Sequence, residues 1–334
     1  MKVRAAINGF GRIGRTVLRA IFESQRDDIE IVAVNSRANN EMNAHLLKYD
    51  TIHGRFAYDI KLEDNNFIIK DKIIRATSIQ DPSSIEWNDL NVDVVLECTG
   101  VFTAREKAAQ YLKTGAKKVL VSAPSAGADF TVVYGVNHNE LSKDHIIVSN
   151  ASCTTNCLAP VAKVLDEAIG IENGFMTTIH SYTGDQPTLD KAHKDFYRAR
   201  AAACSIIPTT TGAAKAVGLV LPNLKGKLDG VAVRVPTPNV SMVDLVFNAK
   251  RATSVEEINN AIRTASESYL KGVLSYTDEK LVSSDFIHDA HSSIFHMDQT
   301  KVMDGTLCRV VSWYDNEWGF SNRMLDTAVA MANL

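Results

Sequence analysis

The chain has 334 residues, of which 45% are hydrophobic and 22% charged, a composition typical of a globular protein with room for two cores. Its net charge of −3 gives no electrostatic reason to expect nucleic acid or an anionic membrane as a partner. No run of ~18 apolar residues is present, and the first residues follow a strand pattern, not that of a secretory signal. We therefore expect a cytoplasmic protein that binds neither nucleic acid nor membranes.

The five cysteines are an odd and scattered set, at positions 98, 153, 157, 204 and 308. This spread argues against a disulfide framework. Cys153 and Cys157 lack the C-x-x-C spacing of a zinc site, and no histidine lies within a few residues of them. We expect no bound metal.

Strand-like and helical patterns alternate through the first half of the chain. The apolar strand-like runs cover 3–7, 29–34, 93–99 and 118–123. Helical patterns cover 12–24 and 104–114. This alternation predicts an α/β domain of the Rossmann type, with a largely parallel sheet packed between helices.

A glycine-rich turn joins the first strand to the first helix. Gly9, Gly11 and Gly14 follow the G-x-G-x-x-G pattern in the sequence NGFGRIG. Glycines here permit a tight turn and a close backbone approach to a pyrophosphate, which then lies at the helix N-terminus. The pattern alone is weak, but its place between a strand and a helix predicts a dinucleotide site.

The end of the second strand bears on which dinucleotide binds. An NAD-specific site usually has an acidic residue about 20 residues beyond the glycines. The chain has Asn35, Ser36 and Arg37 there. Without a carboxylate, a 2′-phosphate is not repelled, and Ser36 and Arg37 offer it a hydrogen bond and a positive charge. We favour NADP; in the alternative, Arg37 is only solvated and Asn35 or Ser36 binds NAD.

Cys153 lies where a strand-like run over 145–148 is followed by a helical pattern, within the sequence SNASCTTNC. The unpaired N–H groups and positive dipole at a helix N-terminus favour a thiolate. We therefore expect the pKa of Cys153 to lie below that of a free thiol, which would make it a nucleophile. The alternative is a buried structural cysteine.

The second half of the chain has a different pattern. Long strand-like segments cover 230–236 and 241–250, and a helix is predicted near 255–270. These segments predict an α+β domain with a mainly antiparallel sheet. We expect a dinucleotide-binding domain over 1–152, with a C-terminal helix over 316–334 packed back on it, and a catalytic domain over 153–315.

His180 closes a strand-like run in the second half, FMTTIH. A lone histidine is commonly structural, but beside an activated cysteine it is a candidate general base.

Several residues of the second half are candidates for binding an anion. Arg234 interrupts an apolar strand in which Val231, Val233 and Val235 share the other face, and a guanidinium there needs an anionic partner. The sequence TTTG at 209–212 precedes a helical run and offers hydroxyl and helix N–H groups. Positive charge nearby in sequence comes from Arg198 and Arg200. The open alternative is that these arginines form internal salt bridges with Asp185 or Asp190.

From end to end, the chain resembles the phosphorylating glyceraldehyde-3-phosphate dehydrogenases. The resemblance is carried by the motifs INGFGRIGR, AHLLKYDTIHGRF, SNASCTTNC, TIHSYTGDQ, SIIPTTTGAAKAVG, AVRVPTPNVS and WYDNEWGFSNRM. It implies oxidation of glyceraldehyde 3-phosphate with inorganic phosphate in a homotetramer. It also implies that Cys153 is the nucleophile and His180 its partner.

The resemblance assigns further residues to ligands. Two phosphate-binding positions, one for the substrate and one for inorganic phosphate, would be formed by Ser152, Thr154, Thr183, Arg198, Thr211, Gly212 and Arg234. Further contacts to the dinucleotide would come from Arg12, Ile13, Thr99, Ser122 and Asn316, the last orienting the nicotinamide amide.

Two departures from the common NAD-dependent pattern bear on the cofactor. Ser36 replaces the expected aspartate, and Lys191 with Ala192 replaces a Leu-Pro pair found in many relatives. In this family that second segment reaches the adenosine ribose of a neighbouring subunit, so Lys191 would add a cation for a 2′-phosphate. Both departures favour NADP.

Two other readings remain open. Erythrose-4-phosphate dehydrogenases share the fold and the cysteine chemistry, although Thr183 fits the glyceraldehyde-phosphate pattern better. A catalytically silent relative that acts as a binding module is the non-enzymatic alternative. The presence of Cys153, His180 and the anion-binding set argues against it, as does the absence of a basic stripe.

Overall fold

The computed structural model describes residues 2–334, which divide into two compact units. The first unit comprises residues up to Val132, His138–Ala151 and Ser321–Leu334. The second comprises Val133–Asn137 and Ser152–Phe320. No helix within residues 2–334 is long and apolar enough to cross a membrane.

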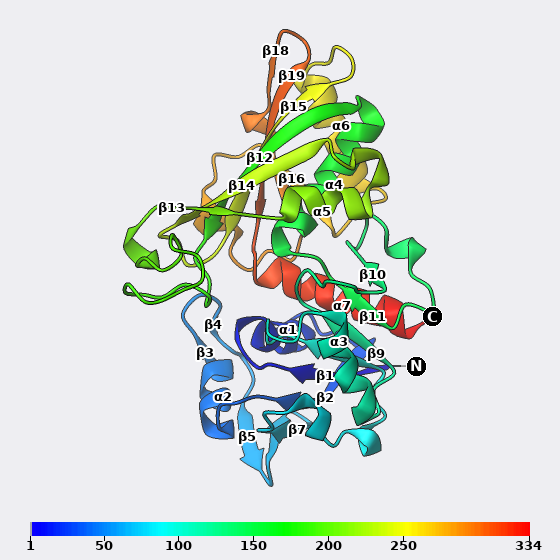
Figure 1. The fold of residues 1–334 in the computed structure, drawn as a ribbon, viewed down its shortest axis with the longest axis vertical. Helices are drawn as coiled ribbons and strands as arrows, with labels where there is room; N and C mark the ends of the chain where they lie inside the picture. Colours follow the sequence, from blue (N-terminus) through cyan, green and yellow to red (C-terminus); the bar gives the residue numbers. More distant parts are fainter. Residues whose placement is uncertain (1) are drawn as a thin grey trace. The chain divides into compact units, whose positions relative to one another are not determined.

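The first unit is built on a nine-stranded sheet in the order β10-β11-β9-β8-β1-β2-β7-β6-β5 (Figure 1). The strands from β10 to β7 pair in parallel, whereas β5, β6 and β7 form an antiparallel edge. Their bounds are β1 Val3–Asn8, β2 Ile29–Asn35, β5 Ile60–Glu63, β6 Asn66–Ile69, β7 Lys72–Thr77, β8 Val94–Glu97, β9 Lys118–Val121, β10 Phe130–Thr131 and β11 Ile147–Ser149. The central strands are apolar and almost wholly buried, as strands covered on both faces must be.

The helices of the first unit are α1 Arg12–Glu23, α2 Asn40–Lys48 and α3 Arg105–Ala108, and a small hairpin is formed by β3 Tyr49–Asp50 and β4 Gly54–Arg55. The predicted helix over 104–114 is wrong in its second part, because Ala109–Thr114 is a 3₁₀ helix. Ala108, Tyr111 and Thr114 are all fully buried. This spacing of three matches the three residues per turn of a 3₁₀ helix.

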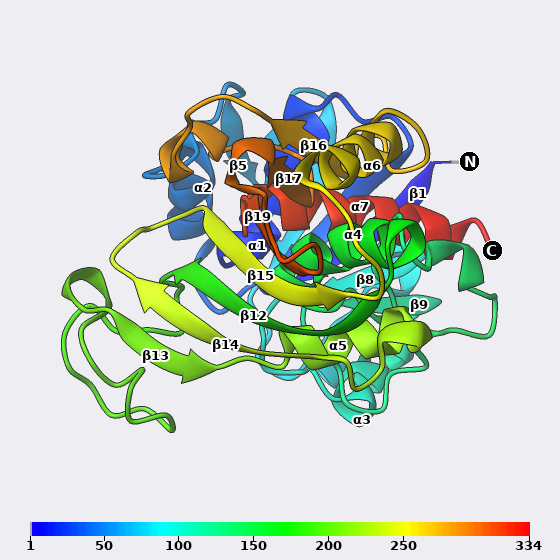
Figure 2. The same cartoon turned by 90° about the horizontal axis from the view of Figure 1, so that it is seen from above.

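The second unit is built on an eight-stranded sheet in the order β13-β14-β12-β15-β19-β17-β16, with β18 beside β19 (Figure 2). Most pairs are antiparallel; β12 with β14 and β16 with β17 are parallel. The strands are β12 Ile171–Ser181, β13 Ile207–Thr210, β14 Leu228–Val235, β15 Ser241–Ala249, β16 Leu274–Thr277, β17 Ser293–His296, β18 Lys301–Met303 and β19 Leu307–Tyr314. The helices are α4 Cys153–Ala168, α5 Ala213–Val220 and α6 Val255–Glu267.

One face of this second sheet is buried and the other is partly open. Along β15 the pattern alternates, with Val243, Leu245 and Phe247 buried and Val246 exposed. Helix α4 packs against β12, β15, β17 and β19 on the buried face. The two sheets together confirm the predicted pairing of a Rossmann domain with a mainly antiparallel α+β domain.

The last helix, α7 Trp318–Ala332, continues from the second unit into the first. Within the first unit, the Ser321 hydroxyl lies 2.6 Å from that of Thr16, and the Thr327 hydroxyl donates to Asn150 at 2.9 Å. Residues 321–334 are thus an integral part of the core that carries the parallel sheet.

Candidate active site

The glycine turn of the first unit joins β1 to α1. Gly9 has a φ of +93°, and a Cβ there would lie 2.6 Å from the Thr99 backbone nitrogen. A Cβ on Gly14 would lie 2.2 Å from the Gly9 carbonyl oxygen. A Cβ on Gly11 would meet nothing within 4 Å, and Gly11 leaves the N-terminus of α1 without a side-chain cap. The turn therefore packs against the sheet at two glycines and leaves the third open for an anion.

A cavity of about 280 Å³ adjoins this turn. The predicted cofactor residues that line it are Gly9, Gly11, Asn35, Ser36, Arg37 and Thr99. Arg12, Ile13 and Gly14 lie in the first turn of α1, and Ser122 follows β9. A cavity of this size beside an uncapped helix N-terminus fits the adenosine half of a dinucleotide.

A buried carboxylate holds two of the residues that line this cavity, Asn8 and Thr99. Glu97, at the end of β8, is completely buried and accepts hydrogen bonds from the Thr99 N–H at 2.7 Å and the Asn8 amide at 3.0 Å. The hydroxyls of Thr99 and Tyr111 also donate to it. Burial and the charge of Glu97 raise the pKa of Tyr111, so this phenol stays a donor. No sequence motif pointed to Glu97.

The side chain of Asn35 is fully hydrogen-bonded to other residues of the protein. Its amide donates to Asn8 Oδ1 and to the Ile79 carbonyl, both at 2.8 Å. Its own oxygen accepts from the Ile79 N–H and the Thr77 hydroxyl, both at 2.9 Å. All four of its hydrogen-bonding positions are therefore occupied. Asn35 lines the cavity, so its place at the cofactor site stays a prediction in which its side chain keeps these four hydrogen bonds.

The side chains of Ser36 and Arg37 differ in whether they already bond to other residues. The Ser36 hydroxyl lies 3.3 Å from both Asn43 Oδ1 and the Ala38 N–H. Arg37 is exposed, and no carboxylate of residues 2–334 forms an ion pair with it. Arg37 therefore remains available to an anion from solution.

Arg12 is held by Asp50, with guanidinium nitrogens 2.5 and 3.1 Å from the two carboxylate oxygens. Burial of Asp50 opposes its ionisation. The hydrogen bonds from Arg12 and from the backbone N–H groups of His53 and Ile52 outweigh this effect and lower the pKa of Asp50 to about 2. Arg12 is thus fixed beside the glycine turn by a carboxylate that stays charged.

Cys153 and His180 meet in the second unit. Cys153 is the first residue of α4, and the hydroxyl of the N-cap residue Ser152 accepts the Thr155 N–H at 3.0 Å. The Cys153 Sγ lies 3.6 Å from Nε2 of His180, at the end of β12. The other ring nitrogen, Nδ1, donates to the Ser181 carbonyl at 2.7 Å. In the neutral ring, Nε2 therefore carries a lone pair directed at the sulfur.

Burial dominates the charge state of this pair. It raises the pKa of the Cys153 thiol, although Arg234 and hydrogen bonds with Thr154 act in the opposite direction. Burial and the nearby Arg234 charge lower the pKa of His180 to about 3. The predicted lowering of the thiol pKa is therefore wrong, because desolvation outweighs the helix N-terminus. Both shifts favour a neutral thiol facing the neutral imidazole Nε2.

Arg234 lies beside this pair on the buried face of β14. Val231 on the opposite face of the strand is 40% exposed, whereas Ala232, on the same face as Arg234, is buried. Arg234 donates to the Ser181 carbonyl at 2.8 Å and lies 3.5 Å from the Thr183 hydroxyl. Its buried Nε has no partner among residues 2–334. A half-buried guanidinium hydrogen-bonded to neutral partners is suited to an incoming anion.

Arg198 is shared between carboxylates and a hydroxyl. It lies 3.1 Å from Asp185, 3.1 Å from the Thr209 hydroxyl and 3.8 Å from Asp195. Arg200 pairs with Asp190 at 2.8 Å. Both internal salt bridges left open by the sequence are thus formed, and an anion at Arg198 has to compete with Asp185.

The remaining predicted phosphate ligands lie at the N-termini of α4 and α5. The Thr211 hydroxyl accepts the Ala213 N–H at 3.1 Å, and Gly212 is the N-cap residue of α5. The Thr155 hydroxyl links α4 to the Ala213 carbonyl at 3.4 Å. The Thr154 hydroxyl is bound to Tyr314 at 2.8 Å. Thr211 and Gly212 thus lie near the start of α4, whereas the Thr154 side chain is already engaged.

Lys191 and Asn316 also belong to the second unit. Lys191 is exposed, and its backbone N–H donates to the Ala199 carbonyl at 2.9 Å. Asn316 is buried and accepts hydrogen bonds from two serine hydroxyls.

Residues 2–334 contain no group of three metal-ligating side chains placed to hold a metal ion.

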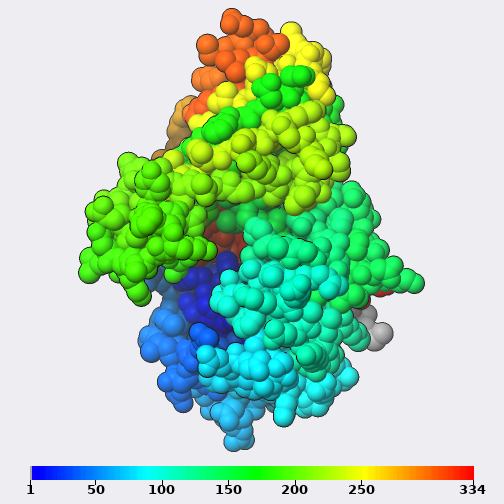
Figure 3. Space-filling view, in the orientation of Figure 1, coloured from blue at the N-terminus to red at the C-terminus, as the bar shows by residue number. Residues whose placement is uncertain are grey.

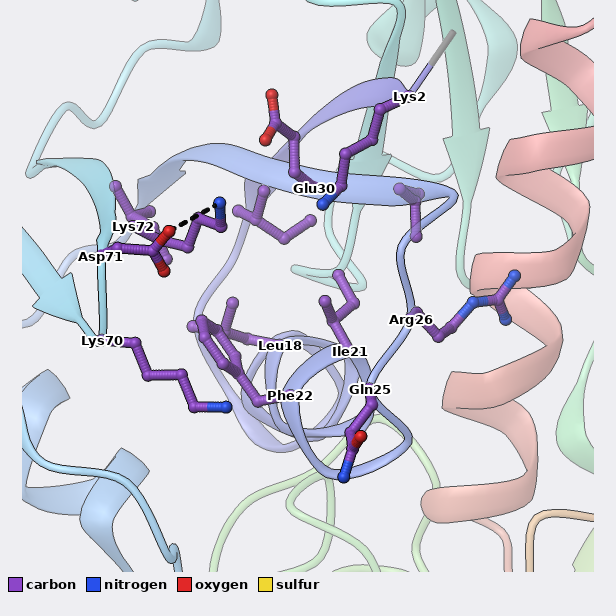
Figure 4. Close-up of a pocket in the computed structure, with 13 residues that line it drawn as sticks. Lys2, Leu18, Ile21, Phe22, Gln25, Arg26, Glu30, Lys70, Asp71 and Lys72 are labelled. Atoms are coloured by element: carbon purple, nitrogen blue, oxygen red, sulfur yellow. Dashed lines mark hydrogen bonds and ion pairs between the residues drawn. The ribbon is translucent and has the colours of Figure 1, made fainter.

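A separate hollow of about 240 Å³ lies between α1 and the strands β2 and β7. Its apolar wall includes Leu18, Ile21 and Phe22, and the side chains of Lys2 and Lys70 lie around it (Figure 4). None of the predicted site residues lines this hollow. It is therefore not part of the candidate active site.

Comparisons with known proteins agree across the length of the chain. A model of the NAD-binding domain of glyceraldehyde 3-phosphate dehydrogenases matches residues 3–105, and one of their C-terminal domain matches residues 152–316. The glyceraldehyde-3-phosphate dehydrogenases of Xanthobacter flavus and Cereibacter sphaeroides are 65% and 66% identical to the chain over 334 residues, covering 100% of both chains in each case. The Geobacillus stearothermophilus enzyme of that name is 54% identical, over 100% of this chain and 99% of its own.

Proposed function

The chain belongs to the glyceraldehyde-3-phosphate dehydrogenase family of NAD(P)-dependent oxidoreductases, and on this premise we propose its specific reaction. It oxidises D-glyceraldehyde 3-phosphate with inorganic phosphate to 1,3-bisphosphoglycerate, reversibly and with NADP as the preferred cofactor. The observation that carries the proposal is the 3.6 Å approach of Cys153 Sγ to an unprotonated His180 Nε2. This geometry gives a thiol a base within reach.

In the proposed chemistry, His180 Nε2 takes the thiol proton, and the thiolate attacks the aldehyde carbon. His180 returns the proton to the oxyanion, which leaves a thiohemiacetal on Cys153. His180 then removes the hydroxyl proton as a hydride leaves the carbon, and a thioester remains. A bound nicotinamide supplies the hydride acceptor. An oxygen of inorganic phosphate attacks the thioester carbon, the C–S bond breaks, and the acyl phosphate leaves with Cys153 restored as a thiolate.

Two groups of side chains are proposed to hold the two phosphates. Arg234 donates to the Ser181 carbonyl, which also accepts from His180, and lies 3.5 Å from the Thr183 hydroxyl. Arg198, Thr211 and Gly212, together with Ser152 and Thr154, complete the proposed set. Guanidinium groups and helix N-termini are the donors that phosphate prefers.

The preference for NADP rests on Ser36, Arg37 and Lys191. Arg37 is exposed beside the 280 Å³ cavity and forms no ion pair with residues 2–334, so it can bind a 2′-phosphate. One observation favours the NAD alternative. Arg37 also lines a neighbouring hollow together with Glu41, Glu63 and Asp64, whose negative charges oppose a phosphate there.

A homotetramer is proposed as the working form. The segment over 182–206 forms a lobe of the second unit, green in Figure 3, and carries exposed Leu189, Phe196 and Ile206. Phe196 is 90% exposed. Apolar side chains this exposed are commonly covered by another chain. In the tetramer, Lys191 of one subunit would approach the adenosine ribose bound to another.

The reaction and the cofactor are tested together by steady-state kinetics with glyceraldehyde 3-phosphate and inorganic phosphate. We expect kcat/KM to be higher with NADP than with NAD. Ser36→Asp should shift that ratio toward NAD by about 10-fold or more, because a carboxylate repels the 2′-phosphate. Ser36→Ala, which adds no charge, is the matched control. A strong NAD preference of the native chain would contradict the cofactor assignment but not the reaction.

The two rival functions are separated by substrate and by thiol chemistry. Higher kcat/KM with erythrose 4-phosphate than with glyceraldehyde 3-phosphate would identify the chain as an erythrose-4-phosphate dehydrogenase. A silent binding module would show no turnover with either aldehyde. Its Cys153 would also gain no protection from alkylation when substrate is added.

A further inference from the structure

Ser181, the last residue of β12, connects three of the proposed functional side chains. It is completely buried. Its carbonyl accepts from His180 Nδ1 at 2.7 Å and from Arg234 at 2.8 Å. Its hydroxyl donates to Asn316 Oδ1 at 2.8 Å, and its N–H donates to the Ser241 hydroxyl at 3.1 Å. Every polar group of this residue is therefore used.

Ser241, the first residue of β15, completes the arrangement; β12 and β15 lie side by side in the sheet (Figure 2). Its hydroxyl accepts the Ser181 N–H and lies 2.8 Å from Asn316 Oδ1. A hydroxyl has one proton to donate, and the carboxamide oxygen is the acceptor placed to receive it. Two buried serine hydroxyls therefore converge on one oxygen of Asn316, which fills both of its lone pairs.

This convergence fixes which end of the Asn316 carboxamide faces outward. A carboxamide is nearly symmetric in shape, so hydrogen bonds determine whether its oxygen or its NH₂ group points in a given direction. With the NH₂ group turned toward the serines, both hydroxyls would face its N–H donors, and the 3.3 Å contact between the two hydroxyls could take up only one of their two protons. With the oxygen toward the serines, the Asn316 NH₂ group points away and offers only donors.

We propose that Ser181 and Ser241 are positioning residues that lock the Asn316 carboxamide with its N–H groups outward, so that the cofactor's nicotinamide binds through its carboxamide carbonyl in one ring orientation. This inference rests on the proposed function. The Ser181 carbonyl also accepts hydrogen bonds from His180 and Arg234. The same residue therefore fixes the positions of the base and of the phosphate-binding arginine relative to the nicotinamide ring.

The test compares ligands with and without the nicotinamide. The probes are NADP and 2′-phospho-ADP-ribose, with NAD and ADP-ribose as a second pair, and the readout is Kd by calorimetry. The Ser181→Ala, Ser241→Ala double variant should bind NADP about 10-fold more weakly, and 2′-phospho-ADP-ribose as the native chain does. Ser181→Ala alone keeps every backbone hydrogen bond of that residue, so it should fold normally and show a smaller loss in the same direction. Ser293→Ala removes another buried serine hydroxyl of the same sheet, bonded to Ser312 at 2.6 Å, and should change neither Kd.

A second readout is the stereochemistry of transfer from deuterated aldehyde, which should become mixed in the double variant because the ring is no longer held in one orientation. Equal weakening of NADP and 2′-phospho-ADP-ribose would overturn the proposal, since it would show a general structural effect. Unchanged NADP binding together with unchanged stereochemistry would also overturn it. If the native chain bound none of the four probes, the proposed function would fail, and this proposal with it.

Discussion

The glycine turn of the first unit and the cysteine cluster of the second are built in different ways. The turn depends on the backbone, on the missing Cβ atoms at Gly9 and Gly14 and on the uncapped start of α1. The cysteine cluster depends on side chains that are far apart in sequence, such as Cys153 and His180. A site made of backbone is damaged by added atoms, whereas a site made of side chains is damaged by removed ones.

The largest effect is expected at Cys153. Cys153→Ala removes the nucleophile, so we expect turnover to fall by about 10⁴-fold or more, with the fold and cofactor binding intact. Steady-state rates and a dinucleotide titration on the same preparation measure this. Cys204→Ser, at an exposed cysteine, should retain native activity. Substantial turnover by Cys153→Ala would refute the role of this thiol.

A smaller loss of catalytic rate is expected at His180, the proposed base. His180→Asn should slow hydride transfer by about 10²-fold, because the thiol and the thiohemiacetal hydroxyl lose their proton acceptor. Stopped-flow absorbance of the reduced nicotinamide measures this step directly. Unchanged pre-steady-state rates would show that the 3.6 Å contact has no catalytic role.

The glycine turn is tested by alanine substitutions, each of which adds one methyl group. Gly9→Ala places a Cβ 2.6 Å from the Thr99 nitrogen at a φ of +93°, and we expect it to reduce the free energy of unfolding by about 2 to 4 kcal/mol. Gly11→Ala meets nothing within 4 Å and should cost less than about 1 kcal/mol while weakening dinucleotide binding. Urea unfolding and calorimetry separate the two effects. Equal stability losses would contradict the division of roles between these glycines.

A pH-dependent effect on stability, smaller than the upper figure for Gly9→Ala, is expected at Asp50. The pKa of Asp50 is lowered to about 2 in the folded chain, so its ionisation stabilises the fold at pH values above its ordinary pKa, and this contribution disappears as the pH falls through about 2. Asp50→Asn should therefore reduce the free energy of unfolding by about 2 kcal/mol at pH 7 and by less at pH 3. Urea unfolding at the two pH values checks this. A loss that does not depend on pH would show that the Arg12 pair does not set this pKa.

The same contrast explains how much the sequence could predict. The strand, turn and helix around Gly9, Gly11 and Gly14 are local, and the pattern placed them correctly. The start of α4 at Cys153 was also predicted, because the apolar run and the helical spacing adjoin it. The two sheets followed from the change of pattern along the chain.

What the sequence could not provide is the effect of burial and of partners distant in the chain. The pKa of Cys153 was predicted in the wrong direction, because desolvation is a property of the folded surroundings. Nor could the sequence show that the Asn35 carboxamide is fully hydrogen-bonded to Asn8, Thr77 and Ile79. Glu97 and Ser181 had no motif of their own, since their roles depend on contacts formed only in the fold.

The central claim is that Cys153 carries the substrate as a thioester before phosphate attacks. The most direct measurement is mass spectrometry of the chain quenched after mixing with glyceraldehyde 3-phosphate and NADP without inorganic phosphate. The account predicts a burst of reduced cofactor of about one equivalent per chain, with the matching acyl mass on the peptide that contains Cys153. A burst without an acyl adduct, or an adduct on another cysteine, would contradict it.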